Sequence, residues 1–132
     1  MAAGEKRAIL VIDDDEGVRD MIQDTLSARG YHVEVASSCQ EGMSIFRRQR
    51  IDLAIVDIFM PDKDGLETLM EMRRNSSEAR VLAISGGGGI GFEHGLVLAQ
   101  KLGAKGTLPK PFTPEELRAK VAELLGKDPA SD

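Results

Sequence analysis

The chain is short of several features that mark other classes of protein. It has one cysteine, Cys39, and no tryptophan in 132 residues. A single cysteine excludes a disulfide within the chain and a metal site built from cysteines. We therefore expect Cys39 to be a small residue of the core or of a helix surface. Apolar runs are also short, such as residues 8–12, whereas a helix that spans a bilayer needs roughly 20 apolar residues.

The chain has fewer basic than acidic residues. Seventeen lysines and arginines stand against 22 acidic residues, which gives a net charge of -5. This balance disfavours non-specific binding to the phosphates of nucleic acids. The first residues also lack the charged and then apolar pattern of a signal peptide. We therefore expect a cytoplasmic protein that contacts neither nucleic acid nor a membrane directly.

Five short apolar, β-branched runs alternate with five longer segments of helical periodicity. This alternation predicts one α/β domain with a parallel sheet that is covered on both faces. The expected strands are 8–13, 31–36, 53–57, 80–85 and 105–108. The expected helices are 16–29, a segment through 43–46, 66–73, a segment through 96–102, and 114–125. We assign residues 7–126 to this domain and expect flexible segments at 1–6 and 127–132.

Polar residues stand where the expected strands end. Asp13 and Asp14 follow the first strand, and Asp57 ends the third. Ser85 ends the fourth strand, and Lys110 follows the fifth. Right-handed crossovers bring the carboxyl ends of parallel strands to one edge, so we expect these side chains to gather there. Three carboxylates at one point repel each other, and their oxygens suit a hard cation such as Mg²⁺.

This residue set fits phosphoryl transfer to a carboxylate. A carboxylate nucleophile such as Asp57 can form an aspartyl phosphate if the three equatorial oxygens of the phosphoryl group are neutralised. Mg²⁺, Lys110 and the hydroxyl of Ser85 provide one contact for each of these oxygens.

Four sequence elements occur in a fixed order along the chain. They are Ile-Leu-Val-Ile-Asp-Asp-Asp (9–15), Asp-Ile-Phe-Met-Pro-Asp-Lys-Asp-Gly (57–65), Ser85 and Lys-Pro-Phe (110–112). In this order the chain resembles the receiver domains of two-component response regulators, over about residues 6–125. The resemblance implies a flavodoxin-like, doubly wound (βα)₅ fold with strand order 2-1-3-4-5.

The resemblance also implies a role for each acidic residue. Asp57 is expected to be the phosphoacceptor and a ligand of Mg²⁺. Asp13 and Asp14 are expected to be the other acidic metal ligands, and the backbone carbonyl of Phe59 a further one.

Two further residues take their roles from the same resemblance. Ser85 is expected to be the switch hydroxyl, and Lys110 the residue that contacts the phosphate, with a cis bond to Pro111. The expected phosphate source is a sensor histidine kinase or a histidine phosphotransfer protein. The phosphorylated form is expected to signal by conformational change to an unidentified downstream protein, as a monomer or a weak homodimer.

Two other functions remain open. One is a degenerate receiver that serves only as a binding module. The complete set of site residues argues against this function. A small phosphohydrolase of the haloacid-dehalogenase type would also use an aspartate nucleophile, Mg²⁺ and a lysine. Such enzymes need an acid two residues after the nucleophile, where this chain has Phe59. We therefore expect no enzymatic turnover.

The chain departs from the receiver pattern at two places. Thr107 stands where most receivers have an aromatic residue that swings inward on activation. The glycine-rich segment 86–91 is longer than usual, and we expect it to transmit the signal by an order–disorder change. This segment also matches a dinucleotide-binding fingerprint, but it lacks the acidic residue expected about 20 positions later.

Overall fold

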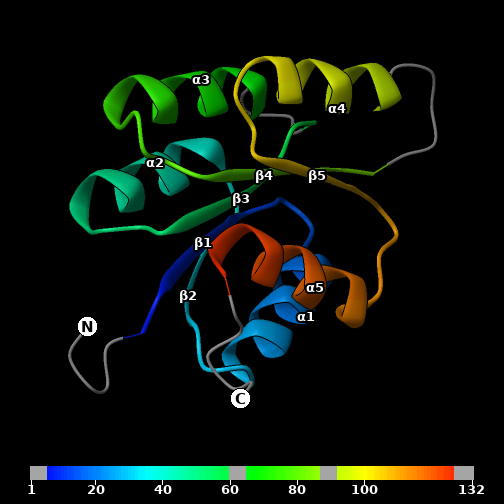
Figure 1. Cartoon of the computed structure of the whole chain (residues 1–132). Coiled ribbons are helices and arrows are strands. Elements are labelled where there is room, and N and C mark those ends of the chain that lie inside the picture. Colours follow the sequence, from blue (N-terminus) through cyan, green and yellow to red (C-terminus); the bar gives the residue numbers. More distant parts are fainter. Residues whose placement is uncertain (1–5, 60–64, 87–91, 127–132) are drawn as a thin grey trace.

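The structure, a computed structural model, describes residues 6–59, 65–86 and 92–126, in which strands and helices alternate (Figure 1). The strands are β1 (Ala8–Ile12), β2 (His32–Ala36), β3 (Leu53–Asp57), β4 (Val81–Ser85) and β5 (Gly106–Pro109). The helices are α1 (Glu16–Ser27), α2 (Cys39–Arg48), α3 (Gly65–Asn75), α4 (Phe92–Lys101) and α5 (Pro114–Leu125).

The strands form one parallel sheet in the order β2-β1-β3-β4-β5. This confirms the flavodoxin-like fold and the strand order that the resemblance implied. It also confirms that the strand at 32–36, which alternates apolar and polar residues, is an edge strand. Because all strands run in one direction, their carboxyl ends share one edge of the sheet.

Helices cover both faces of the sheet (Figure 1). α1 and α5 lie on one face, and α2, α3 and α4 lie on the other. Alternate residues of each strand point to opposite faces, so the sheet separates two cores. The buried core under α1 and α5 consists of Ile9, Val11, Ile22, Leu26, Tyr31, Leu53, Ile55, Leu82, Ile84, Leu108, Leu117, Val121 and Leu125. The buried core under α2, α3 and α4 consists of Leu10, Ile12, Ala36, Cys39, Met43, Ile45, Ala54, Val56, Ile58, Leu69, Met72, Val81, Ala83, Leu96, Ala99 and Ala104.

Side-chain caps and glycines set the limits of several helices. Asp15, Ser38 and Thr113 precede α1, α2 and α5, and each accepts a hydrogen bond from a backbone N–H of the first turn. Gly30 and Gly103 follow α1 and α4 with φ angles of 95° and 113°. A residue with a side chain is strained in this conformation, which explains why glycine ends these helices.

Most sequence expectations for the fold are confirmed. Each strand begins and ends within one residue of its expected bounds. Cys39 is buried in the core, and the Lys110–Pro111 bond is cis. No helix in the described ranges is long and apolar enough to span a bilayer. The expected flexible segments, except Lys6, and the glycine-rich segment, except Gly86, lie outside the described residues.

Candidate functional site

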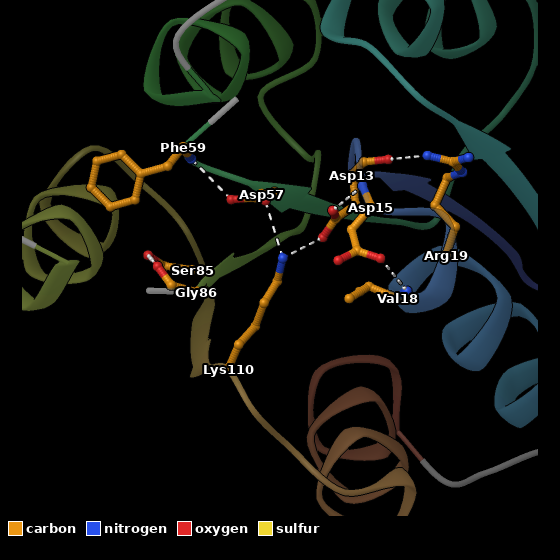
Figure 2. A network of polar contacts seen from close by, with 9 residues as sticks. All are labelled: Asp13, Asp15, Val18, Arg19, Asp57, Phe59, Ser85, Gly86 and Lys110. Atoms are coloured by element: carbon orange, nitrogen blue, oxygen red, sulfur yellow. Dashed lines mark hydrogen bonds and ion pairs between the residues drawn. The ribbon is translucent and has the colours of Figure 1, made fainter. Parts of the chain in front are cut away.

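The carboxyl edge of the sheet brings two acids and a lysine into contact (Figure 2). Asp13 follows β1, Asp57 ends β3, and Lys110 follows β5. The Lys110 ammonium group lies 2.7 Å from Asp13 Oδ2 and 3.1 Å from Asp57 Oδ2. Lys110 therefore bridges two carboxylates that come from different strands.

The backbone holds the second oxygen of each carboxylate. Asp13 Oδ1 accepts a hydrogen bond of 2.9 Å from the N–H of Asp15. Asp57 Oδ1 accepts one of 2.9 Å from the N–H of Phe59. The exposed fractions of Asp13 and Asp57 are only 0% and 4%. Both acids are thus buried, fixed in orientation and paired with the same lysine.

Asp14 completes a three-carboxylate cluster. It is exposed, unlike its two partners, and one ligand atom from each of Asp13, Asp14 and Asp57 lies within 4.8 Å of the others. Asp15 caps α1, so neither Asp13 nor Asp14 is needed for that role. With Lys110 paired to the cluster, the formal charges leave an excess of two negative charges. Carboxylate oxygens with this excess fit a divalent cation such as Mg²⁺.

Burial and pairing shift two pKa values at the site. Burial raises the pKa of Asp57 above its ordinary value of 3.8, although the Phe59 N–H and Lys110 act in the opposite direction. Burial lowers the pKa of Lys110, but its contacts with Asp13 and Asp57 outweigh this and hold the pKa above 10.5. Lys110 therefore stays protonated at neutral pH, and a further cation near Asp57 would favour its ionised form.

Ser85 and Gly86 lie beside Lys110 at the end of β4 (Figure 2). The Ser85 carbonyl accepts a 2.8 Å hydrogen bond from the N–H of Lys110. The buried Ser85 hydroxyl has one weak contact, 3.5 Å from the Gly86 carbonyl oxygen. A methyl group at position 86 would lie 3.0 Å from Lys110 Cδ. Gly86 therefore leaves room for the lysine to reach the acids.

Sequence reasoning missed two residues that shape the site. A guanidinium nitrogen of Arg19 donates to the Asp13 carbonyl oxygen over 2.8 Å, which ties α1 to the end of β1. Gly65 starts α3 against the end of β3, where a methyl group would collide with the Asp57 carbonyl oxygen and with Ile58 Cα. Gly65 was recognised only as the last residue of the 57–65 element, because a close approach of two backbones has no local sequence signal.

An apolar cavity of about 440 Å³ lies next to the charged cluster. It lies between the start of α1 and the segment that follows β5. Its lining residues are Asp15, Val18, Met21, Gly86, Lys110, Pro111 and Phe112.

Comparison with known proteins identifies a family. Residues 9–122 match the model of the response regulator receiver domain. Response regulator MprA of Mycolicibacterium vanbaalenii is 34% identical over 124 residues, which are 94% of this chain and 52% of that protein. The MprA protein of Mycobacterium leprae is likewise 34% identical, over 94% of this chain and 53% of its own length. The chain thus spans about half the length of these curated relatives.

Solved structures agree with this similarity. A CheY-like receiver domain protein from Methanospirillum hungatei has a TM-score of 0.84 at 28% identity, covering 92% of this chain and 94% of its own. The response regulator TrrA from Thermotoga maritima, in complex with Mg²⁺ and BeF, has a TM-score of 0.79 at 30% identity. That match covers 90% of this chain and 99% of TrrA.

Proposed function

The chain belongs to the response regulator receiver domain family, and from this premise we propose that it is a phosphoryl-accepting switch with Asp57 as the acceptor. The observation that carries the proposal is the convergence of Asp13, Asp14 and Asp57 on Lys110 at one edge of the sheet. We assign the receiver unit to residues 7–126.

The chemistry begins at a carboxylate oxygen of Asp57. This oxygen attacks the phosphorus atom of the donor, an O–P bond forms, and the bond to the donor's leaving group breaks with its electron pair. Lys110 keeps its proton and neutralises one phosphoryl oxygen. Ser85, one residue beyond the part of β4 that pairs with Asp57, offers its hydroxyl to another oxygen. The Phe59 N–H holds the acceptor in a fixed orientation.

The acidic cluster fits Mg²⁺ as the cofactor. We propose Asp13, Asp14, Asp57 and the backbone carbonyl of Phe59 as its ligands. When bound, the ion supplies positive charge for the phosphoryl oxygens and for the excess of negative charge in the cluster. TrrA, to which this chain is similar, has been solved with Mg²⁺ and a beryllofluoride, which supports the assignment.

The donor we propose is the phosphohistidine of a sensor kinase or of a phosphotransfer protein in the cytoplasm. The apolar cavity beside Lys110 supports this proposal, because it gives an apolar protein surface a place next to the acceptor. The downstream partner is a protein, and a monomer or weak homodimer of this chain recognises it by the changed surface of the phosphorylated state.

Intact mass spectrometry tests the proposal directly. The wild type is incubated with acetyl phosphate and Mg²⁺ and should gain the mass of one phosphoryl group. Asp57→Asn should gain none, and chelation of Mg²⁺ should prevent the gain in the wild type. Asp24→Asn, which alters an exposed acid of α1, is the matched control and should be phosphorylated normally. An equal gain in Asp57→Asn would show that another residue is the acceptor.

The mass measurement tests one of the two alternatives, and a phosphatase assay tests the other. A degenerate receiver would gain no phosphoryl group at all. A phosphohydrolase would release phosphate continuously from a small phosphomonoester. We expect no such turnover, because Phe59 provides no acid at the position where those enzymes carry one.

A further inference from the structure

We propose that Phe59 is a positioning residue that links the state of Asp57 to helix α4. The inference rests on the proposed function, since it concerns the response of the protein to phosphorylation of Asp57. In most receivers an aromatic residue of strand five transmits the signal, and this chain has Thr107 there, which has no aromatic ring. The inference assigns this transmission role to Phe59.

The backbone of Phe59 is hydrogen-bonded to the acceptor, Asp57. Its N–H donates to Asp57 Oδ1 over 2.9 Å, so the position of residue 59 depends on that oxygen (Figure 2). This hydrogen bond has a charged acceptor only while Asp57 is a carboxylate, and bonds with one charged partner are roughly twice as strong as neutral ones. In an aspartyl phosphate, one former carboxylate oxygen is a carbonyl oxygen and the other bridges carbon and phosphorus in a mixed anhydride. Phosphorylation therefore weakens the bond that holds Phe59.

The ring of Phe59 packs against α4. Figure 2 shows it turned away from Lys110, toward that helix. A methyl group at position 95 of α4 would lie 2.9 Å from Phe59 Cζ, 3.2 Å from Phe59 Cε2 and 2.8 Å from Ile58 Cδ1. Such contacts are too close for a side chain, so Gly95 is what allows α4 to rest on the ring.

The hydrogen bond to Asp57 and the packing against α4 form one continuous path of contacts. Asp57, the Phe59 backbone, the Phe59 ring and Gly95 follow each other without a gap. The Phe59 side chain is 50% exposed, so the ring has room to move when its backbone shifts. Closely packed side chains respond to such a shift by changing from one packing arrangement to another. A local change can reach a whole helix in this way.

Gly95→Ala tests the path at the end that lies away from the acceptor. Beryllofluoride with Mg²⁺ is added as a phosphoryl mimic, and amide hydrogen exchange is measured at residues 96–101. In the wild type we expect exchange there to change on adding the mimic. In Gly95→Ala we expect this change to be lost, because the new methyl group displaces the ring beforehand. Acetyl phosphate should still phosphorylate Asp57 in this variant.

Gly42→Ala is the matched control, because it adds a methyl group to a glycine of α2 that packs against Ile12 instead of the acceptor loop. The α4 response should survive in this variant. A wild-type response in Gly95→Ala, or a loss of Asp57 phosphorylation in it, would contradict the inference. If the wild type itself takes no phosphoryl group, the proposed function has failed, and the mass measurement reports this separately.

A second measurement does not depend on how well Gly95→Ala folds. The chain has only four phenylalanines, so fluorinated phenylalanine gives a simple ¹⁹F spectrum. Phe59→Leu identifies the signal of Phe59 by its disappearance. We expect this signal to shift when beryllofluoride and Mg²⁺ are added to the wild type. A Phe59 signal that stays in place while α4 responds would show that the helix is reached by another route.

Discussion

The two helical layers differ in how they are packed against the sheet. Among the described residues, the buried core under α1 and α5 contains large aliphatic residues, one tyrosine and no alanine. The core under α2, α3 and α4 contains five alanines and Cys39. Each helix of this second layer also carries a glycine at which a methyl group would collide with a neighbour: Gly42, Gly65 and Gly95.

We expect this difference in packing to give the two layers different roles, one in stability and the other in signalling. Large buried side chains stabilise through the apolar area that they remove from water. Small residues contribute less area but bring backbones close together, so a small displacement of one is felt by the next. Two of the three close glycines, Gly65 and Gly95, contact residues 57–59. We therefore expect the α1/α5 layer to act as a rigid support and the second layer to respond to the acceptor.

The largest expected effect is on the α1/α5 layer. Leu26 of α1 is 0% exposed, so Leu26→Ala should lower the free energy of unfolding by about 2–5 kcal/mol, as buried leucine truncations do. The phosphorylation rate of the folded protein should change little. Urea unfolding and acetyl phosphate kinetics measure the two quantities, with Leu98→Ala on the exposed surface of α4 as control. If the phosphorylation rate fell as steeply as the stability, the proposed difference between the two layers would be wrong.

Gly65→Ala should give the reverse pattern. The methyl group meets backbone atoms of Asp57 and Ile58, which cannot rotate away. We expect a loss of about 1–3 kcal/mol, which outweighs the roughly 0.5–1 kcal/mol that alanine gains over glycine in a helix. Phosphorylation of Asp57 should also slow markedly.

Gly42→Ala is the control for that substitution. Here the methyl group meets Cδ1 and Cγ1 of the buried Ile12 side chain instead of backbone atoms. We expect a loss of stability here as well, but phosphorylation should be normal. Equal effects of the two substitutions on the phosphorylation rate would show that closeness to the acceptor backbone is irrelevant.

Mg²⁺ should join the two layers, since Asp14 leads into α1 while Asp57 leads toward α3. At ten times its dissociation constant, an ion that binds only the folded state stabilises by about 1.4 kcal/mol. Asp14→Asn should bind the ion more weakly and show less stabilisation at the same concentration. Urea unfolding across a Mg²⁺ titration measures this, with the exposed Asp24→Asn as control. Equal stabilisation of both variants would remove Asp14 from the ligand set.

The smallest expected effect is a pH dependence without Mg²⁺. Because the folded-state pKa of Asp57 is raised above 3.8, the folded protein binds the proton of this group more tightly than the unfolded chain does. Its contribution to stability therefore falls as pH rises from 3.8 to the raised pKa, and then stays constant. Asp57→Asn should lack this fall. Unfolding free energies of both proteins over that pH range provide the test, and parallel curves would contradict the assigned shift.

The sequence predicted β1, β3 and β4 well because each is a short apolar run with a clear polar end, as at Asp57. It also predicted which side chains gather at the sheet edge, because parallel topology places them there. The contacts of Gly65 and Gly95 were not predictable. They join segments far apart in the chain or one backbone to another, and glycine in a sequence indicates a turn as readily as a close approach.

On the proposed function, the bridge made by Lys110 would couple phosphorylation of Asp57 to binding of the metal ion. One ammonium group serves both Asp13 and Asp57. A phosphoryl group on Asp57 that draws the ammonium toward its own oxygens would leave Asp13 short of positive charge and so raise the affinity of the site for a divalent cation. Thermodynamic reciprocity then requires the cation to favour the phosphorylated form by the same factor. If the proposed function holds, the lysine would make metal concentration and phosphorylation level two inputs of one equilibrium.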